Sequence, residues 1–251
     1  MSSTIASSST APVIVVFGAG PGLGASIARR FGKEGFRVAL VGRRQAPLNE
    51  LAVALKADSV EAAPFTADLS DPAQVPALIA NIRERFGRID VVEYGPASAG
   101  EQGFTPATQL DAAALEKSTR FLLLTPVEIV RAVLPELTER GTGAILVTHG
   151  MSAAIAMPFL SGTGPAMSAM RNYIYSLNGE LKDTGVYAGT LTIGALIVRE
   201  DAASNETFPD DAEAAGAFPT VHPDVLADLY WDMYTQRDAA ERTYPESLPT
   251  A

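Results

Sequence analysis

Runs of β-branched, aliphatic and aromatic residues recur along the chain and mark its predicted strands. The first run, Val-Ile-Val-Val-Phe at residues 13–17, is unbroken, which is typical of a strand buried on both faces of a parallel sheet. Similar runs bring the predicted strands to six, at residues 13–17, 36–41, 62–65, 89–92, 144–148 and 187–193.

Between the strands, apolar residues recur every three or four positions, which is the spacing of one buried helix face. The spacing predicts helices at residues 25–33, 48–55, 75–86, 112–137, 164–181 and 223–242, the fourth of them kinked at Pro126. Because strand and helix alternate throughout, we expect a single α/β domain, with a Rossmann-type, doubly wound parallel sheet and right-handed crossovers.

Three segments depart from the alternation. Residues 1–11, rich in Ser and Thr, are expected to be a disordered lead-in to a domain over residues 12–251. The acidic, irregular segment 199–220 follows the sixth strand at the edge where open α/β sheets bind ligands, so we expect a mobile lid. A solvated loop without ligand contacts is the alternative.

The tail after Arg242 has two prolines and no β-branched run, so no seventh strand is expected.

Composition excludes several function classes. The 251 residues are 47% hydrophobic, enough for one large core, and carry 29 acidic against 19 basic side chains, for a net charge of −10. This charge repels nucleic acid on average. Without cysteine and with two histidines, the chain offers no disulfide, thiolate or histidine-rich metal site. It has no long apolar membrane segment and no secretion signal, so the expected location is the cytoplasm.

A glycine-rich loop joins the first strand to the first helix and is the main candidate for cofactor binding. It contains Gly18, Gly20, Gly22 and Gly24, with Leu23 between the last two. Such a loop turns sharply and presents backbone N–H groups and a helix N-terminus to a phosphate. A plain tight turn is the alternative interpretation.

Two arginines follow the second strand, where an NAD-binding chain usually has an acidic residue for the ribose hydroxyls. Gly42 is followed here by Arg43 and Arg44. Guanidinium groups bind a 2′-phosphate that a carboxylate would repel, so the sequence predicts NADP(H) rather than NAD(H). The alternative is a solvated arginine pair at a helix start.

Over about residues 13–197 the chain resembles the short-chain dehydrogenase/reductase family. The spacing of Gly18, Gly22 and Gly24 is similar to the family's glycine motif, and Gly-Arg-Ile-Asp-Val at residues 87–91 is similar to its run into the fourth strand. The family's Asn-Asn-Ala-Gly reads here as Tyr-Gly-Pro-Ala at residues 94–97.

The resemblance extends the predicted cofactor site. It implies that Asp68 and Leu69 contact the adenine ring, that Gly194 flanks the nicotinamide, and that Gly95 belongs to the same site. The full predicted set is Gly18, Gly20, Gly22, Leu23, Gly24, Arg43, Arg44, Asp68, Leu69, Gly95 and Gly194.

The family's four catalytic residues are all replaced. In the family a Tyr exchanges the proton, a Lys one helical turn later lowers its pKa, a Ser orients the carbonyl, and an Asn supports a water relay. The matching positions hold Thr163, Met167, Gly150 and Leu122. None of these side chains exchanges a proton near neutral pH.

Three neighbouring side chains are candidates to take over. His149 is a candidate because an unperturbed histidine titrates near neutral pH. Strand alternation points it away from the face of residue 150, and a structural role is the stronger interpretation. Tyr94 ends the fourth strand near the expected nicotinamide, or simply packs there. Ser152 is polar and close to the site, but has no base beside it.

Two functions remain open. The first is an atypical NADP(H)-dependent oxidoreductase acting on an activated small-molecule acceptor of the iminium or enone type, which needs little acid catalysis. The second is a non-redox, NADP(H)-binding protein on the same fold, since fold does not decide function. By the resemblance, the helices at residues 115–137 and 164–181 are expected to form a homodimer.

Overall fold

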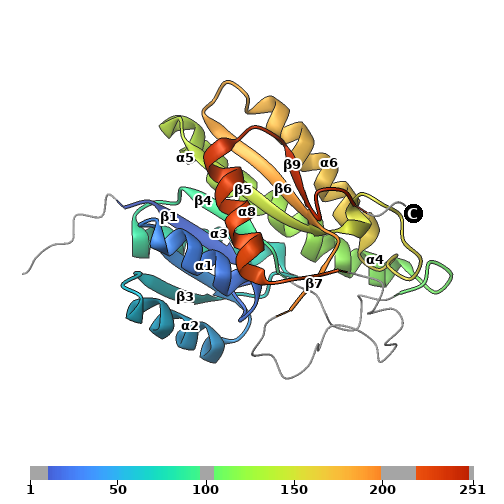
Figure 1. The fold of residues 1–251 in the computed structure, drawn as a ribbon, viewed down its shortest axis with the longest axis horizontal. Coiled ribbons are helices and arrows are strands. Elements are labelled where there is room, and N and C mark those ends of the chain that lie inside the picture. Colours follow the sequence, from blue (N-terminus) through green and yellow to red (C-terminus); the bar gives the residue numbers. More distant parts are fainter. Residues whose placement is uncertain (1–10, 97–104, 199–218, 249–251) are drawn as a thin grey trace, which may run out of the picture.

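The computed structural model describes residues 11–96, 105–198 and 219–248, which form an α/β fold (Figure 1). The main sheet has seven parallel strands in the order β3-β2-β1-β4-β5-β6-β9. Their bounds are β1 Val13–Phe17, β2 Arg37–Gly42, β3 Ala62–Thr66, β4 Val91–Tyr94, β5 Gly143–Gly150, β6 Val186–Ile193 and β9 Glu241–Tyr244. The order reverses between β1 and β4, which confirms the predicted doubly wound sheet. At such a switch point, open α/β sheets bind their ligands in the crevice outside the carboxyl ends of the strands.

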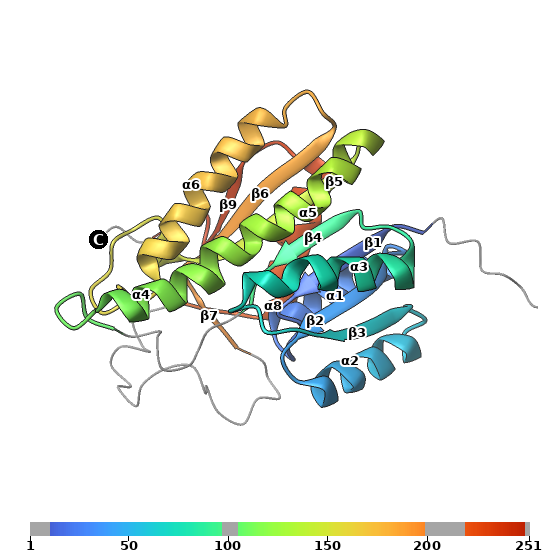
Figure 2. The same cartoon turned by 180° about the vertical axis from the view of Figure 1, so that it is seen from behind.

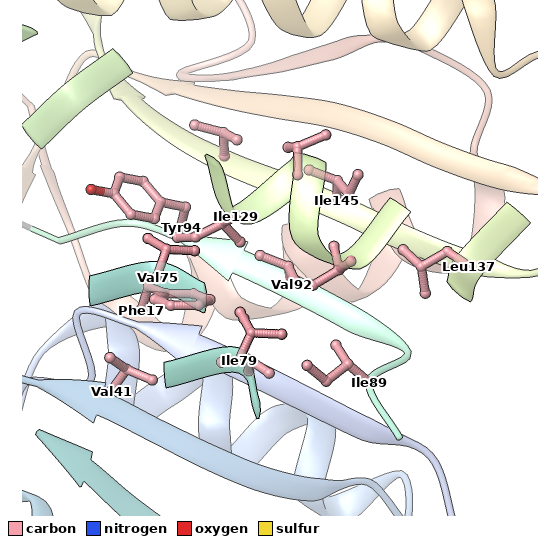
Figure 3. Packing of buried hydrophobic residues seen from close by; sticks show 14 of the residues in the cluster. Phe17, Val41, Val75, Ile79, Ile89, Val92, Tyr94, Ile129, Leu137 and Ile145 are labelled. Atoms are coloured by element: carbon pink, nitrogen blue, oxygen red, sulfur yellow. The ribbon is translucent and has the colours of Figure 1, made fainter. Parts of the chain in front are cut away.

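Helices cover both faces of the sheet, which explains why β1, β2, β4, β5 and β6 are buried along most of their length. One face carries α1 (Leu23–Lys33), α2 (Gln45–Ala57) and α8 (Pro223–Gln236) (Figure 1). The other carries α3 (Val75–Phe86), α5 (Thr125–Arg140) and α6 (Gly164–Glu180) (Figure 2). Each face has its own cluster of buried apolar side chains, and Figure 3 shows part of the α3–α5 side.

The seventh strand corrects the sequence prediction, which expected none after Arg242. β9 pairs in parallel with β6, and its four residues are only partly buried. An edge strand pairs on one side only, so it can form from a short polar stretch without a β-branched run. The prolines that argued against a strand lie outside it, beginning with Pro245.

The helix predicted at 112–137 is divided into three parts. α4 (Ala112–Thr119) passes into a π-helical turn (Arg120–Leu124) and then into α5. Pro126 lies in the first turn of α5, where a missing N–H costs little. The proline therefore marks where the helical register changes, close to the predicted kink.

Short elements complete the described part of the chain. Single 3₁₀ turns lie at Pro72–Gln74 and Met151–Ala153, and β7 (Leu196–Ile197) pairs in parallel with β8 (Thr220–Val221). The predicted lead-in and most of the predicted lid, at residues 1–10 and 199–218, lie outside the described residues. Within the described ranges, no helix combines the length and apolar character that crossing a bilayer requires.

Candidate functional site

The glycine loop after β1 makes a tight turn for which two of its glycines are needed. Gly18 has a φ of +95°, and a Cβ atom there would lie 2.5 Å from Pro96 Cα. A Cβ atom at Gly24 would lie 2.6 Å from the Gly18 carbonyl oxygen. Side chains at these positions would therefore clash with backbone, which explains half of the glycine motif by packing alone.

Gly20 and Gly22 have no such internal reason to be glycine. A Cβ atom at Gly22 would meet nothing within 4 Å, and one at Gly20 would meet only the Gly18 carbonyl oxygen at 3.9 Å. Gly22 is the residue before α1, and no side chain caps that helix. The positive end of α1 thus faces an open space where an anion can approach the backbone.

The predicted adenine and 2′-phosphate residues follow β2 and β3, two adjacent strands. Arg43 and Arg44 are exposed after β2. Asp68 accepts hydrogen bonds from the N–H and hydroxyl of Ser70, which lower its pKa, and the charge of Arg43 lowers it further. Leu69 is buried, and its carbonyl accepts a hydrogen bond from Thr125 Oγ1 at 2.7 Å. Arg43 and Asp68 thus lie within electrostatic range of each other.

Two of the four positions of the family's catalytic residues, Gly150 and Met167, meet at the end of β5, and Thr163 lies one helical turn before Met167. A Cβ atom at Gly150 would lie 3.9 Å from Met167 Sδ, and Ser152 Oγ contacts the same sulfur at 3.8 Å. Thr163 is buried at the residue before α6. The fourth position, Leu122, is buried within the π-helical turn. The Met167 thioether and the Ser152 hydroxyl lie beside Gly150, and neither is an acid or base near neutral pH.

Tyr94 is tied to that π-helical turn. Its hydroxyl donates to the carbonyl of Phe121 at 2.5 Å, and its ring packs beside Phe17 in the core (Figure 3). This carbonyl has no partner within the helix. The N–H of Thr125, four residues on, donates to the Arg120 carbonyl instead, and Pro126, five residues on, has no N–H. Burial raises the pKa of Tyr94 well above its usual value. The hydroxyl thus completes the helix, and this geometry favours the packing interpretation.

His149 is almost fully buried, on the side of the sheet that faces α6. Burial lowers its pKa to about 4, with Glu241 opposing and Arg171 reinforcing the shift. Its Nε2 has no hydrogen-bonding partner among the described residues. His149 is therefore neutral at pH 7 and has no proton to donate as an imidazolium.

The two remaining glycines of the predicted cofactor site, Gly194 and Gly95, have close neighbours. Gly194 donates its N–H to the carbonyl of Tyr244 at 2.7 Å, which joins the loop after β6 to β9. Gly95 donates to the carbonyl of Phe17 at 3.1 Å. A Cβ atom at Gly95 would overlap Glu93 Oε1 and lie 2.5 Å from Thr148 Oγ1. A buried carboxyl thus occupies the space next to Gly95.

Sequence reasoning missed that carboxyl. Glu93 is 1% exposed, and its Oε1 accepts a hydrogen bond from Thr148 Oγ1 at 2.8 Å. Thr148 Oγ1 in turn lies 2.5 Å from the hydroxyl of the fully buried Tyr230. Burial raises the pKa of Glu93 to about 8, although the bond from Thr148 opposes the shift. The signal in the sequence is an acidic residue directly after Val91-Val92, where the predicted strand was ended.

Comparison with known proteins agrees with this architecture. The Danio rerio protein named dehydrogenase/reductase SDR family member 7B is 29% identical over 231 residues, covering 86% of this chain and 72% of that protein. Across several such relatives, the chain spans 57% to 72% of the relative's own length.

Two solved structures share the fold. A metagenomic short-chain oxidoreductase in complex with NADP has a TM-score of 0.74 at 22% identity, covering 96% of this chain and 98% of that one. L-Sorbose reductase from Gluconobacter frateurii, complexed with NADPH and L-sorbose, has a TM-score of 0.76 at 22% identity, with 90% of both chains covered. A family model described as short chain dehydrogenase matches residues 12–207, and the chain belongs to that family.

Proposed function

We propose that the crevice at the carboxyl ends of β1 and β4 binds NADP(H). The observation that carries this proposal is the start of α1, which no side chain caps and where Gly20 and Gly22 leave open space. A pyrophosphate there accepts hydrogen bonds from backbone N–H groups and is stabilised by the helix dipole. The NADP and NADPH complexes of proteins with the same fold support this choice of cofactor.

The remaining cofactor contacts follow from position. Arg43 and Arg44 are exposed beyond β2, where they can reach the 2′-phosphate, and Asp68 with Leu69 lies beyond β3 for the adenine. Gly95 and Gly194, after β4 and β6, border the nicotinamide half. A bidentate guanidinium contact to a phosphate favours NADP(H) over NAD(H).

We further propose that the protein is an NADP(H)-dependent oxidoreductase that acts on an activated small-molecule acceptor. Bound NADPH supplies a hydride. An iminium carbon that accepts a hydride becomes a neutral amine, so the protein has no proton to deliver. A conjugated enone becomes an enolate, which water can protonate. Neither acceptor needs the missing Tyr and Lys, whereas a simple ketone loses the roughly 10²–10⁴-fold benefit of general acid catalysis.

The described side chains suit such an acceptor. Gly150 stands at the family's Ser position and leaves space beside the sulfur of Met167, which stands at the family's Lys position. The nearest hydroxyl, Ser152, contacts that sulfur and has no base beside it among the described residues. These residues can bind and orient an acceptor in a largely apolar surrounding, but they do not transfer a proton.

The test is NADPH oxidation with matched acceptors. Cyclic iminium salts and activated enones should turn over roughly 10²–10⁴-fold faster than simple ketones of similar size. Gly22→Asp puts a carboxylate at the anion site without a clash and should abolish turnover. Gly179→Asp, also in open space but within α6, is the matched control and should remain active. Equal turnover of ketones and iminium ions would contradict the proposal.

A non-redox, NADP(H)-binding protein is the second candidate. It is favoured by one observation, the lack of an acid or base among the described side chains around Gly150. This function predicts tight NADPH binding with no oxidation by any acceptor of the panel. It also predicts that Gly22→Asp abolishes cofactor binding, as in the first candidate, so turnover separates the two.

A further inference from the structure

The Glu93 carboxyl lies beside Gly95 at the carboxyl end of β4, where the cofactor is proposed to bind. Glu93 pairs with Val16 across the β1–β4 boundary, two residues before Gly18. Its Oε1 and Thr148 Oγ1 occupy the space where a side chain of Gly95 would stand, and the next residue, Pro96, packs against Gly18. The backbone of residues 95–96 thus links the carboxyl to the start of the glycine loop.

No positive charge compensates this carboxyl within the described residues. From β5 it meets the Thr148 hydroxyl, and beyond that the Tyr230 hydroxyl from α8. Its strand neighbours Val16 and Leu146 are apolar. The buried positions of the adjacent α1 are Ala25, Ser26, Ile27, Ala28 and Phe31. Burial raises the pKa of Tyr230 well above its usual value, so Tyr230 stays neutral as well.

The hydroxyl chain leads from Tyr230 through Thr148 to the Glu93 carboxyl and carries no charge. Tyr230 can donate to Thr148, and Thr148 donates to Glu93 Oε1, so each hydroxyl proton is used once. An ionised carboxylate at this depth would have one neutral donor and no counterion. Burying a charge without a partner is costly, and such a group keeps its proton instead.

A dinucleotide in the crevice adds negative charge on the same side. Two phosphates at the start of α1 and a carboxylate below Gly95 would repel each other across a poorly solvated region. We infer that Glu93 is a positioning residue of the cofactor site, and that the dinucleotide binds only while this residue holds a proton. The inference rests on the proposed NADP(H) site and states how that site is regulated.

The coupling has a definite sign. The pKa of Glu93 lies near 8 without cofactor, and a bound polyanion raises it further, so the complex holds the proton to higher pH. Below that pKa the affinity is insensitive to Glu93. Above it, binding must take up one proton, and the affinity falls by at most about tenfold for each pH unit.

Calorimetric titration with NADP⁺ between pH 7 and 9.5 tests the inference. Repeating it in buffers of different ionisation enthalpy measures the protons taken up on binding. The wild-type protein should lose roughly tenfold in affinity one pH unit above the Glu93 pKa and should take up close to one proton there. Glu93→Gln, which cannot ionise, should show neither effect. Glu84→Gln, an exposed carboxylate on α3, is the matched control and should keep the wild-type profile.

Thr148→Val gives an independent variant that keeps Glu93. Removing the one hydrogen bond to the carboxyl should raise its pKa and move the loss of affinity to higher pH. A flat wild-type affinity without proton uptake would overturn the inference and leave the proposed function standing, as would a Glu93→Gln profile equal to the wild type. Failure to bind NADP⁺ at every pH would overturn both.

Discussion

Burial keeps two ionisable side chains near the carboxyl edge uncharged at neutral pH, by opposite pKa shifts. Glu93, facing α8, has its pKa raised to about 8 and keeps its proton. His149, facing α6, has its pKa lowered to about 4 and is therefore a neutral imidazole at pH 7. Desolvation is the main cause of both shifts, because it disfavours whichever form is charged. Of these two side chains, only Glu93 therefore holds an acidic proton at pH 7.

Arg43 allows a direct test of cofactor preference. Arg43→Ala should weaken NADPH binding by roughly 10- to 100-fold, which corresponds to the loss of a charge-assisted hydrogen bond, and should change NADH binding little. Fluorescence titration with both cofactors measures the difference. Lys56→Ala, which removes another exposed cation from the end of α2, should leave both affinities unchanged. Equal affinity of the wild-type protein for NADPH and NADH would refute the assignment.

Arg43 and Glu93 differ in what the sequence alone could predict. Arg43 can be identified from its position alone, because it directly follows a recognisable apolar strand. Glu93 is missed for the same reason, since a strand defined by an apolar run ends at the first charged residue. Its neutral state depends on Thr148, which is 55 residues away along the chain, and beyond that on Tyr230 in the last helix. Local patterns do not contain such contacts.

The change of helical register between α4 and α5 depends on one side chain from the sheet. The π-helical turn and Pro126 leave the Phe121 carbonyl without a helical partner, and Tyr94 donates to it. A buried carbonyl without a partner costs about 1–3 kcal/mol. The strand end and the helix are therefore joined by a hydrogen bond that neither segment could satisfy alone.

Tyr94→Phe tests this connection. Removal of the hydroxyl should lower the free energy of unfolding in urea by about 1–3 kcal/mol, with faster amide exchange concentrated at residues 120–127. Tyr173→Phe on α6 is the matched control, and it should change stability by less than about 0.5 kcal/mol. If Tyr94→Phe is as stable as the control, the hydroxyl has no structural role, and the catalytic interpretation of Tyr94 regains support.

β9 shows why an edge strand escapes sequence prediction. Its first residue, Glu241, accepts hydrogen bonds from Arg171, Tyr175 and Thr192. Burial raises the pKa of Glu241, but these hydrogen bonds outweigh it and lower the pKa to about 2. The strand is thus held by side-chain contacts to α6 and β6 as well as by backbone pairing. A pattern search for apolar runs detects neither kind of contact.

At the scale of the whole molecule, the core uses many of the apolar side chains of the two segments expected to form a homodimer. Leu122, Ile129, Val133, Ile174 and Leu177 are buried within the single chain. Leu124 remains 44% exposed, Tyr175 43% exposed, and Leu123 and Tyr173 are partly buried. These four side chains lie on the π-helical turn and α6, the segments expected to pair. The remaining exposed apolar side chains therefore lie on the segments expected to pair.

We therefore expect a homodimer with a two-fold axis across α5 and α6, in which the same patch meets its copy. Light scattering at micromolar concentration should give twice the chain mass of 26.3 kDa. Leu124→Glu places two like charges at the interface and should shift the protein to monomer. Val53→Glu, at a position 70% exposed on α2 and on the opposite face, is the matched control and should stay dimeric. A wild-type protein of single-chain mass, or a dimer unaffected by Leu124→Glu, would contradict this interface.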